Sequence, residues 1–106
     1  MTWFDVIKKS AATNALLEII TEDLKITIPH HIESMSTMSK KLNLPVGYDS
    51  MREAFNRTWK NSRVLVSMDA EWMRKFAGDG YNMNDVNWPD ITKGVMKLYD
   101  HIFDNI

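Results

Sequence analysis

The sequence predicts an all-α protein, a small up-down helical bundle, on three observations. Apolar residues recur at helical spacing along most of the chain. Glycine and proline are scarce, with four and three copies, and most of them separate the periodic segments. Apolar residues make up 44% of the chain and charged residues 25%, as in an average globular protein. We therefore expect a single domain over residues 1–106, built from a long helical hairpin, a third long helix and a short N-terminal helix.

A short helix is expected at the start of the chain. Thr2 and Asp5 have the spacing of a capping box, in which each side chain accepts a hydrogen bond from the other residue's backbone N–H. Glu or Gln is the more usual partner at the second position. This helix should end near Ser10 and lie across the bundle as an arm. Its apolar face consists of Trp3, Phe4 and Ile7.

The second helix is expected between residues 13 and 42, where one apolar stripe runs through the segment. Pro29 interrupts the segment but points away from the stripe, which keeps its phase across the proline. That favours one kinked helix. A break at Pro29 stays open, because the β-branched residues before the proline disfavour helix. The stripe contains Leu16, Leu17, Ile20, Leu24, Ile28, His31, Met35, Met38 and Leu42.

A loop over residues 43–49, with one proline and one glycine, separates this helix from a third. We expect the third helix to begin at Ser50, with Glu53 at the capping-box position, and to run to Gly78. Its buried face contains Met51, Phe55, Thr58, Trp59, Ser62, Leu65, Val66, Trp72, Met73 and Phe76.

The last helix is expected after a polar loop over residues 78–87. It should begin around Trp88, because Pro89 suits the first turn of a helix, and continue to the C-terminus. Its apolar stripe contains Ile91, Val95, Leu98, Tyr99, Ile102, Phe103 and Ile106.

His31 and Ser62 are candidates for buried polar residues. If the second and third helices form a hairpin, residues whose numbers add up to about 92 face each other, which pairs His31 with Ser62. A buried histidine beside a hydroxyl can be an acid, a base or a ligand. A core histidine held by a hydrogen bond is the more common case, and it is the interpretation that we favour.

Asp69 lies in the middle of the apolar face of an unbroken third helix, where an unpaired carboxylate is costly. Two interpretations follow. The helix breaks at Ser67, which then caps a new helix with Asp69 in its first turn, and this is the one we favour. Alternatively, Asp69 is a buried functional group near Asp23, and the two acids share a cation or a proton.

No metal ion, cofactor or catalytic residue is expected. The chain has no cysteine, which excludes thiolate sites. No glutamate has a histidine three residues later, the pattern of helical di-metal sites. The segment 79–85 carries oxygen ligands but lacks the residue order of an EF-hand. Glycine-rich nucleotide loops are also absent, so the sequence disfavours an enzyme.

Nucleic acid is a possible partner, because basic residues gather between residues 40 and 75. This segment has eight lysines and arginines and four acids. Trp59 lies at the edge of the expected buried face beside them, and basic side chains that flank an aromatic ring can bind phosphates and stack a base. A solvated basic face is the plainer alternative. The candidate residues are Arg52, Arg57, Trp59, Lys60 and Arg63.

A protein partner is the interpretation we favour. Ile19 and Ile26 lie off the main stripe, seven residues apart on one flank of the second helix, and a second apolar flank is typical of an interface. We expect a non-enzymatic adaptor, inhibitor or assembly subunit that self-associates, most simply as a homodimer. The alternatives are a nucleic-acid-binding domain, and a small enzyme or ligand carrier that uses His31 or Asp69.

The net charge and the length of the apolar runs indicate whether the chain binds or spans a membrane. The net charge is −1, which disfavours binding to anionic surfaces through bulk charge. No apolar run is long enough to span a bilayer, and the first residues do not resemble a secretory signal. We therefore expect no membrane partner and a cytoplasmic location, or the host-cell cytoplasm for a viral protein.

Overall fold

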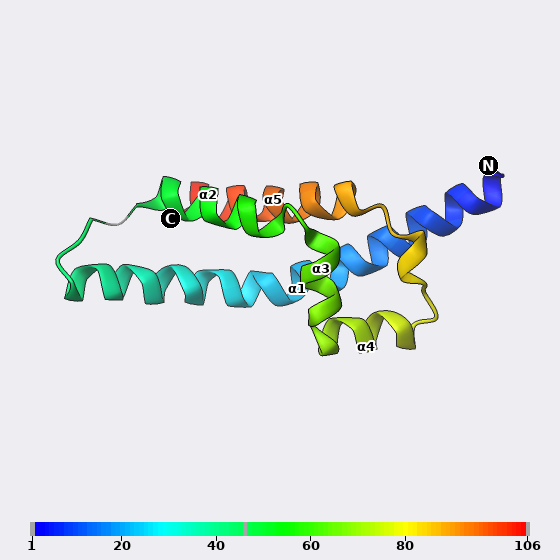
Figure 1. Ribbon diagram of the computed structural model, residues 1–106, viewed down its shortest axis with the longest axis horizontal. Helices are drawn as coiled ribbons and strands as arrows, with labels where there is room; N and C mark the ends of the chain where they lie inside the picture. Colours follow the sequence, from blue (N-terminus) through cyan, green and yellow to red (C-terminus); the bar gives the residue numbers. More distant parts are fainter. Residues whose placement is uncertain (1, 46, 106) are drawn as a thin grey trace.

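The computed structural model describes residues 2–45 and 47–105. In these residues the chain forms five α-helices, one 3-10 turn and no strand, which confirms the all-α prediction. The molecule is 56 Å long and less than half as wide, and α1 runs along its whole length (Figure 1). The bounds are α1 Trp3–Lys41, α2 Tyr48–Trp59, α3 Ser62–Met68, α4 Ala70–Gly78, the 3-10 turn η1 Met83–Asp85 and α5 Trp88–Asp104.

Helix α1 contains both the expected first and second helices. The capping box at its start is formed: Thr2 Oγ1 accepts from the Asp5 N–H at 3.2 Å, and Asp5 Oδ2 accepts from the Thr2 N–H at 3.3 Å. The prediction of a separate helix ending near Ser10 is wrong, since the good helix formers Ala11 and Ala12 follow and no residue there ends a helix.

Pro29 lies inside α1, which continues through it to Lys41. The favoured prediction of a single helix is therefore confirmed, and a break at Pro29 is wrong. The proline is exposed, as expected from its place opposite the apolar stripe. Its missing N–H thus leaves a carbonyl that water can reach.

The core lies between the middle of α1 and helix α5. At Gly94 of α5 the two helices approach closely, because a Cβ there would lie 2.6 Å from Leu17 Cδ2. Apart from Thr13, the buried residues of α1 follow every fourth position, so the stripe rotates slowly around the helix. They are Ala12, Thr13, Leu16, Ile20, Leu24, Ile28 and Ile32. Those of α5 are Ile91, Val95, Tyr99 and Phe103.

The expected third helix is divided into α2, α3 and α4, so the prediction of one helix from Ser50 to Gly78 is wrong. Helix α2 begins at Tyr48, two residues before Ser50, and Gly47 at its N-cap makes no side-chain bond. One break falls at residues 60–61 and another at Asp69. The break expected at Ser67 comes two residues later, because Asp69 itself is the capping residue.

The expected up-down hairpin of α1 with the next helix is not confirmed. In the described residues α5 packs against both α1 and α2, whereas α1 and α2 do not approach each other closely. Aromatic stacking contributes to the contact between α2 and α5, since the Phe55 ring of α2 stacks on Tyr99 of α5 at a centroid distance of 4.5 Å. Helix α4 covers another side of α1. Helix α3 crosses from the end of α2 to the start of α4 (Figure 1).

Candidate interaction surfaces

The first surface is the N-terminal arm, which we define as residues 2–11. Every residue of the arm is exposed, and in Figure 1 it projects beyond the rest of the bundle. Trp3 is 82% exposed and Phe4 is 71% exposed, and Val6 and Ile7 are exposed as well. Single exposed apolar residues are common on proteins, but four within two helical turns form an apolar patch of the kind found at interfaces.

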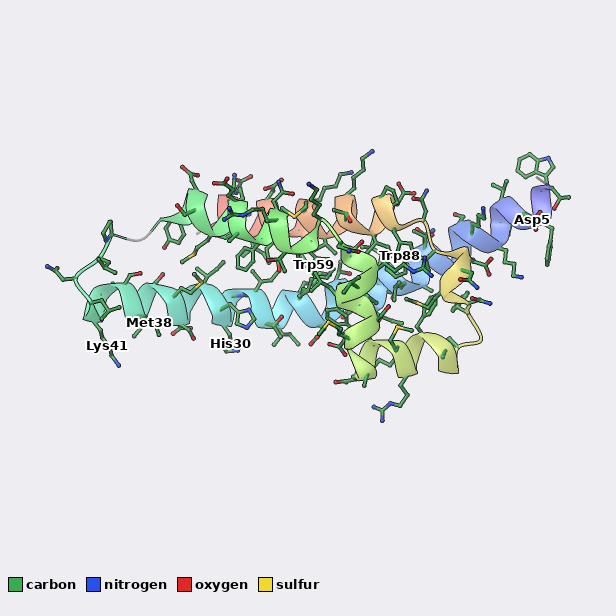
Figure 2. All side chains as sticks on the ribbon, in the orientation of Figure 1. Asp5, His30, Met38, Lys41, Trp59 and Trp88 are labelled. Carbon is green, nitrogen blue, oxygen red and sulfur yellow. The ribbon has the colours of Figure 1, made fainter. Side chains whose placement is uncertain are left out.

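The arm has a capped start and a contact with the rest of the molecule near its base. Its start is fixed by the Thr2–Asp5 capping box, which supplies partners for backbone N–H groups that a helix start leaves unpaired. Near its base, Lys8 Nζ lies 3.8 Å from Asp85 Oδ2 of η1. The arm is therefore a helix of defined direction that presents large apolar side chains to solvent (Figure 2).

The second surface is a groove of about 780 Å³ between α1 and α4, which we call the acidic groove. Both predicted partner residues line it: Ile26 is 65% exposed and Ile19 is half-buried. Its one lysine, Lys75, already pairs with Glu71 at 3.4 Å. The groove is lined by Ala15, Glu18, Ile19, Glu22, Asp23, Ile26, Lys75, Asp79 and Tyr81.

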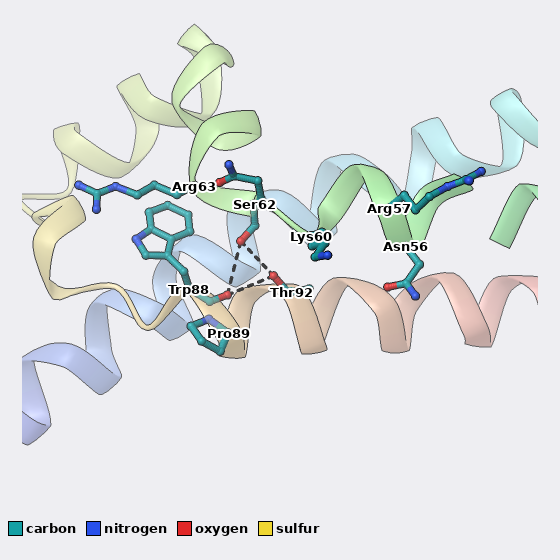
Figure 3. Close-up of a pocket in the computed structure, with 9 residues that line it drawn as sticks. Asn56, Arg57, Lys60, Ser62, Arg63, Trp88, Pro89 and Thr92 are labelled. Carbon is teal, nitrogen blue, oxygen red and sulfur yellow. Dashed lines mark hydrogen bonds between the residues drawn. The ribbon is translucent and has the colours of Figure 1, made fainter. Parts of the chain in front are cut away.

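The third surface is a cleft of about 740 Å³ where α2, α3 and the start of α5 meet, which we call the basic cleft. Three of the predicted basic residues line it, and its lining includes no carboxylate. In Figure 3 the Arg63 side chain extends beside the Trp88 ring, whereas Arg57 points toward the other end of the cleft. Its lining residues are Asn56, Arg57, Lys60, Asn61, Ser62, Arg63, Trp88, Pro89 and Thr92.

Two residues of the predicted basic strip lie outside this cleft. Arg52 pairs with Asp100 at 3.5 Å and Asp104 at 3.3 Å, and its guanidinium lies 5.3 Å from the centre of the Phe103 ring. Trp59 is 4% exposed, so a role in stacking a base is wrong for this residue. Trp88 takes its place in the cleft, although its sequence context indicated only the start of a helix.

Trp59 instead joins α2 to α5. Its indole N–H donates to the Tyr99 hydroxyl at 3.1 Å. Burial raises the pKa of Tyr99 above its usual value of 10.0, and the hydrogen bond from Trp59 partly opposes this shift. The pair satisfies two polar groups inside an aromatic cluster and is therefore structural.

The predicted pairing of His31 with Ser62 is wrong. His31 is exposed on α1, because the buried stripe passes through the next residue, Ile32. Ser62 is buried, but its partner is Thr92, whose hydroxyl lies 3.0 Å from Ser62 Oγ. The Thr92 hydroxyl also lies 3.2 Å from the Trp59 carbonyl oxygen, so these contacts tie the kink after α2 to the start of α5.

Asp69 is the N-cap of α4, so the alternative of a buried functional acid is wrong. Its Oδ1 accepts from the N–H groups of Glu71 at 3.1 Å and Trp72 at 3.0 Å. Asp23 lies nearby as expected, but it accepts from the Trp72 indole N–H at 2.9 Å. The two acids therefore hold opposite ends of one tryptophan and do not form a shared site.

In residues 2–45 and 47–105 no three His, Asp or Glu side chains gather as metal ligands. None of the helices described combines the length and the apolarity needed to cross a membrane. Comparison of the chain with protein-family models, with curated proteins and with solved structures finds no match.

Proposed function

We propose that this protein is a non-enzymatic helical interaction module that self-associates and acts as an adaptor, inhibitor or assembly subunit. The observation that carries the proposal is the N-terminal arm. A capped helix that extends beyond its own core with Trp3, Phe4 and Ile7 exposed is unfavourable in water unless another surface covers it. Burial of each such side chain contributes about 1.5–3 kcal/mol.

The proposal is tested by sedimentation velocity over a wide range of protein concentration. The arm variant carries Trp3→Ser and Phe4→Ser, and the matched control Val64→Ser removes an exposed apolar residue of α3. We expect the wild type and the control to associate and the arm variant to remain monomeric. In solutions too dilute for association, all three should have the same melting temperature. A wild type that is monomeric at every concentration, and whose arm retains no protein in pull-down, would contradict the proposal.

A second candidate function is the binding of single-stranded nucleic acid in the basic cleft. The observation that favours it is that Arg57, Lys60 and Arg63 line one cleft with the half-buried Trp88, without an acid among the lining residues. Cations beside an aromatic ring suit a phosphate and its base.

A fluorescence titration with labelled single-stranded RNA and DNA tests this second candidate. With three cations in contact, the logarithm of affinity should fall with the logarithm of salt concentration with a slope of about −2. Lys60→Glu with Arg63→Glu should abolish binding, whereas Arg74→Glu, outside the cleft, should reduce it only slightly. Absence of binding at low salt would end this candidate.

A further inference from the structure

We propose that the N-terminal arm of one copy docks into the acidic groove of a second copy, and that the exchange is reciprocal. The two α1 helices then lie antiparallel about a two-fold axis near Ala15. This inference rests on the proposed function, since it names the partner of the arm. It also names the segment that binds Ile19 and Ile26, which the sequence alone predicted only as partner-binding residues.

The first argument is that one continuous face of α1 joins the arm to the groove. At 100° per residue its members fall within an arc of about 80°. The last four line the acidic groove, and none of the seven is fully buried in the monomer. The face consists of Phe4, Lys8, Ala11, Ala15, Ile19, Glu22 and Ile26.

The second argument is the register of that face. An antiparallel pair centred on Ala15 places Phe4 opposite Ile26 of the second copy, Ala11 opposite Ile19 and Lys8 opposite Glu22. Apolar residues thus meet apolar residues, and a base meets an acid. Alanines at the centre allow two helices to approach to about 8 Å, while the outer residues of the face, about 33 Å apart along α1, make the remaining contacts.

The third argument is charge complementarity. The arm carries two lysines, Lys8 and Lys9, and one acid, Asp5. Among the described lining residues the groove carries four carboxylates and one lysine. That lysine is paired with Glu71 at 3.4 Å, and Glu22 lies 4.0 Å from Lys25 but remains largely exposed. The arm is therefore basic and the groove acidic, so docking is favoured, whereas two grooves placed face to face would repel each other.

These arguments favour a second copy over an unrelated protein, because the arm and its complement occur on one chain in matching register. A two-fold dimer requires a self-complementary surface of this kind, in which each contact occurs twice. Lys8 is 56% exposed despite its contact with Asp85, so its ammonium remains accessible to a second carboxylate.

The decisive experiment exchanges charges between copies. In the reciprocal dimer Lys8→Glu places two acid–acid contacts across the interface, and Glu22→Lys places two base–base contacts. Each variant alone should dimerise at least about tenfold more weakly than the wild type. An equimolar mixture restores both attractive contacts, so it should form a heterodimer with nearly wild-type affinity in sedimentation equilibrium.

The mixture also controls for damage to the monomer, because each variant keeps any internal defect after mixing. Recovery in the mixture supports the proposal. A mixture as weak as its components, with a wild type that still dimerises through Trp3 and Phe4, would overturn the arm–groove register and leave the proposed function standing. A wild type that does not associate at all, and whose arm retains no protein, would overturn both.

A second measurement uses the absence of cysteine from the chain. Ala15→Cys lies at the proposed axis, where the two Cα atoms come within disulfide range, about 4.4–6.8 Å. The matched control is Asn14→Cys, an exposed position one residue away that faces another direction. Mild oxidation should link the first variant into a dimer several times faster than the second. Equal rates would contradict an axis at Ala15.

Discussion

The middle of α1 and its ends belong to one uninterrupted helix, yet they meet different surroundings. Between Ala12 and Ile32, every fourth side chain is buried against α4 or α5. Before and after this stretch, apolar residues recur at similar spacing, but Phe4 and Met38 are exposed. An apolar stripe therefore indicates that a face is to be covered, and it does not indicate whether the same chain supplies the cover.

The sharpest test of this comparison removes one large apolar side chain from each region. Leu16→Ala in the middle should lower the free energy of unfolding by about 3 kcal/mol, because Leu16 is fully buried and its loss leaves a cavity. For a domain of this size that corresponds to a fall of roughly 15 °C in melting temperature. Calorimetry of the dilute protein is the measurement.

Phe4→Ala in the arm is the matched substitution, and its melting temperature in dilute solution should equal that of the wild type. A fall as large as that of Leu16→Ala would mean that the arm packs inside its own molecule, and the distinction between the two regions would be lost.

The two helix caps offer a second comparison. Asp69→Ala removes both hydrogen bonds that begin α4, next to the core, and should cost about 1 kcal/mol of global stability. Thr2→Ala removes one bond of the arm's capping box and should leave the melting temperature unchanged while the first amides of α1 exchange hydrogen faster. Hydrogen exchange resolved by residue separates the two effects. Equal losses of global stability would contradict this expectation.

The close approach of α1 and α5 predicts opposite effects at two glycines. Gly78→Ala in α4 should stabilise by roughly 0.5 kcal/mol, since the new methyl group meets nothing within 4 Å and alanine favours helix. At Gly94 the same change places the methyl group against Leu17, so the gain in helix propensity should be cancelled or reversed. Chemical denaturation of both variants checks the sign, and two equal gains would show that the helices are further apart.

The smallest expected effect concerns alkaline pH. Because burial raises the pKa of Tyr99 above 10.0, its neutral hydroxyl contributes stability below pH 10.0, and this contribution is lost as the pH rises through the raised pKa. Tyr99→Phe should therefore flatten the alkaline fall in melting temperature, whereas Tyr81→Phe, at an exposed tyrosine, should not. Melting curves recorded on both sides of pH 10.0 are sufficient.

Some local signals predicted the structure well, whereas the helix end expected near Ser10 and the helix start expected at Ser50 were local predictions that were wrong. The capping box of Thr2 and the start of α5 at Trp88 each depend on a few neighbouring residues, whereas the passage of α1 through Pro29 was predicted from the phase of the long apolar stripe. Asp69 was correctly identified as a poor fit to an unbroken helix. Its own capping geometry explains it, and the expected cap at Ser67 was only two residues away.

Other missed features depend on contacts between distant segments. The kink at residues 60–61 follows no glycine or proline, and it is accompanied by contacts of Ser62 and the Trp59 carbonyl with Thr92, about thirty residues later. His31 and Ile32 are both compatible with a helical stripe, and only the position of the packed helices decides between them. The position of the packed helices also decides that Trp59 is buried while Trp88 lines the basic cleft.

The packing of α1 against α5 has a consequence during synthesis. Thr13 of α1 accepts a hydrogen bond from the backbone N–H of Asn87, which lies 74 residues later in the chain. Helix α5 buries the stripe of α1 and begins one residue after Asn87. At the usual rate of translation those residues take about 4 to 15 s to add. For that interval the face of α1 that α5 later covers is exposed on the growing chain, where chaperones or a neighbouring nascent chain can bind it before the core is complete.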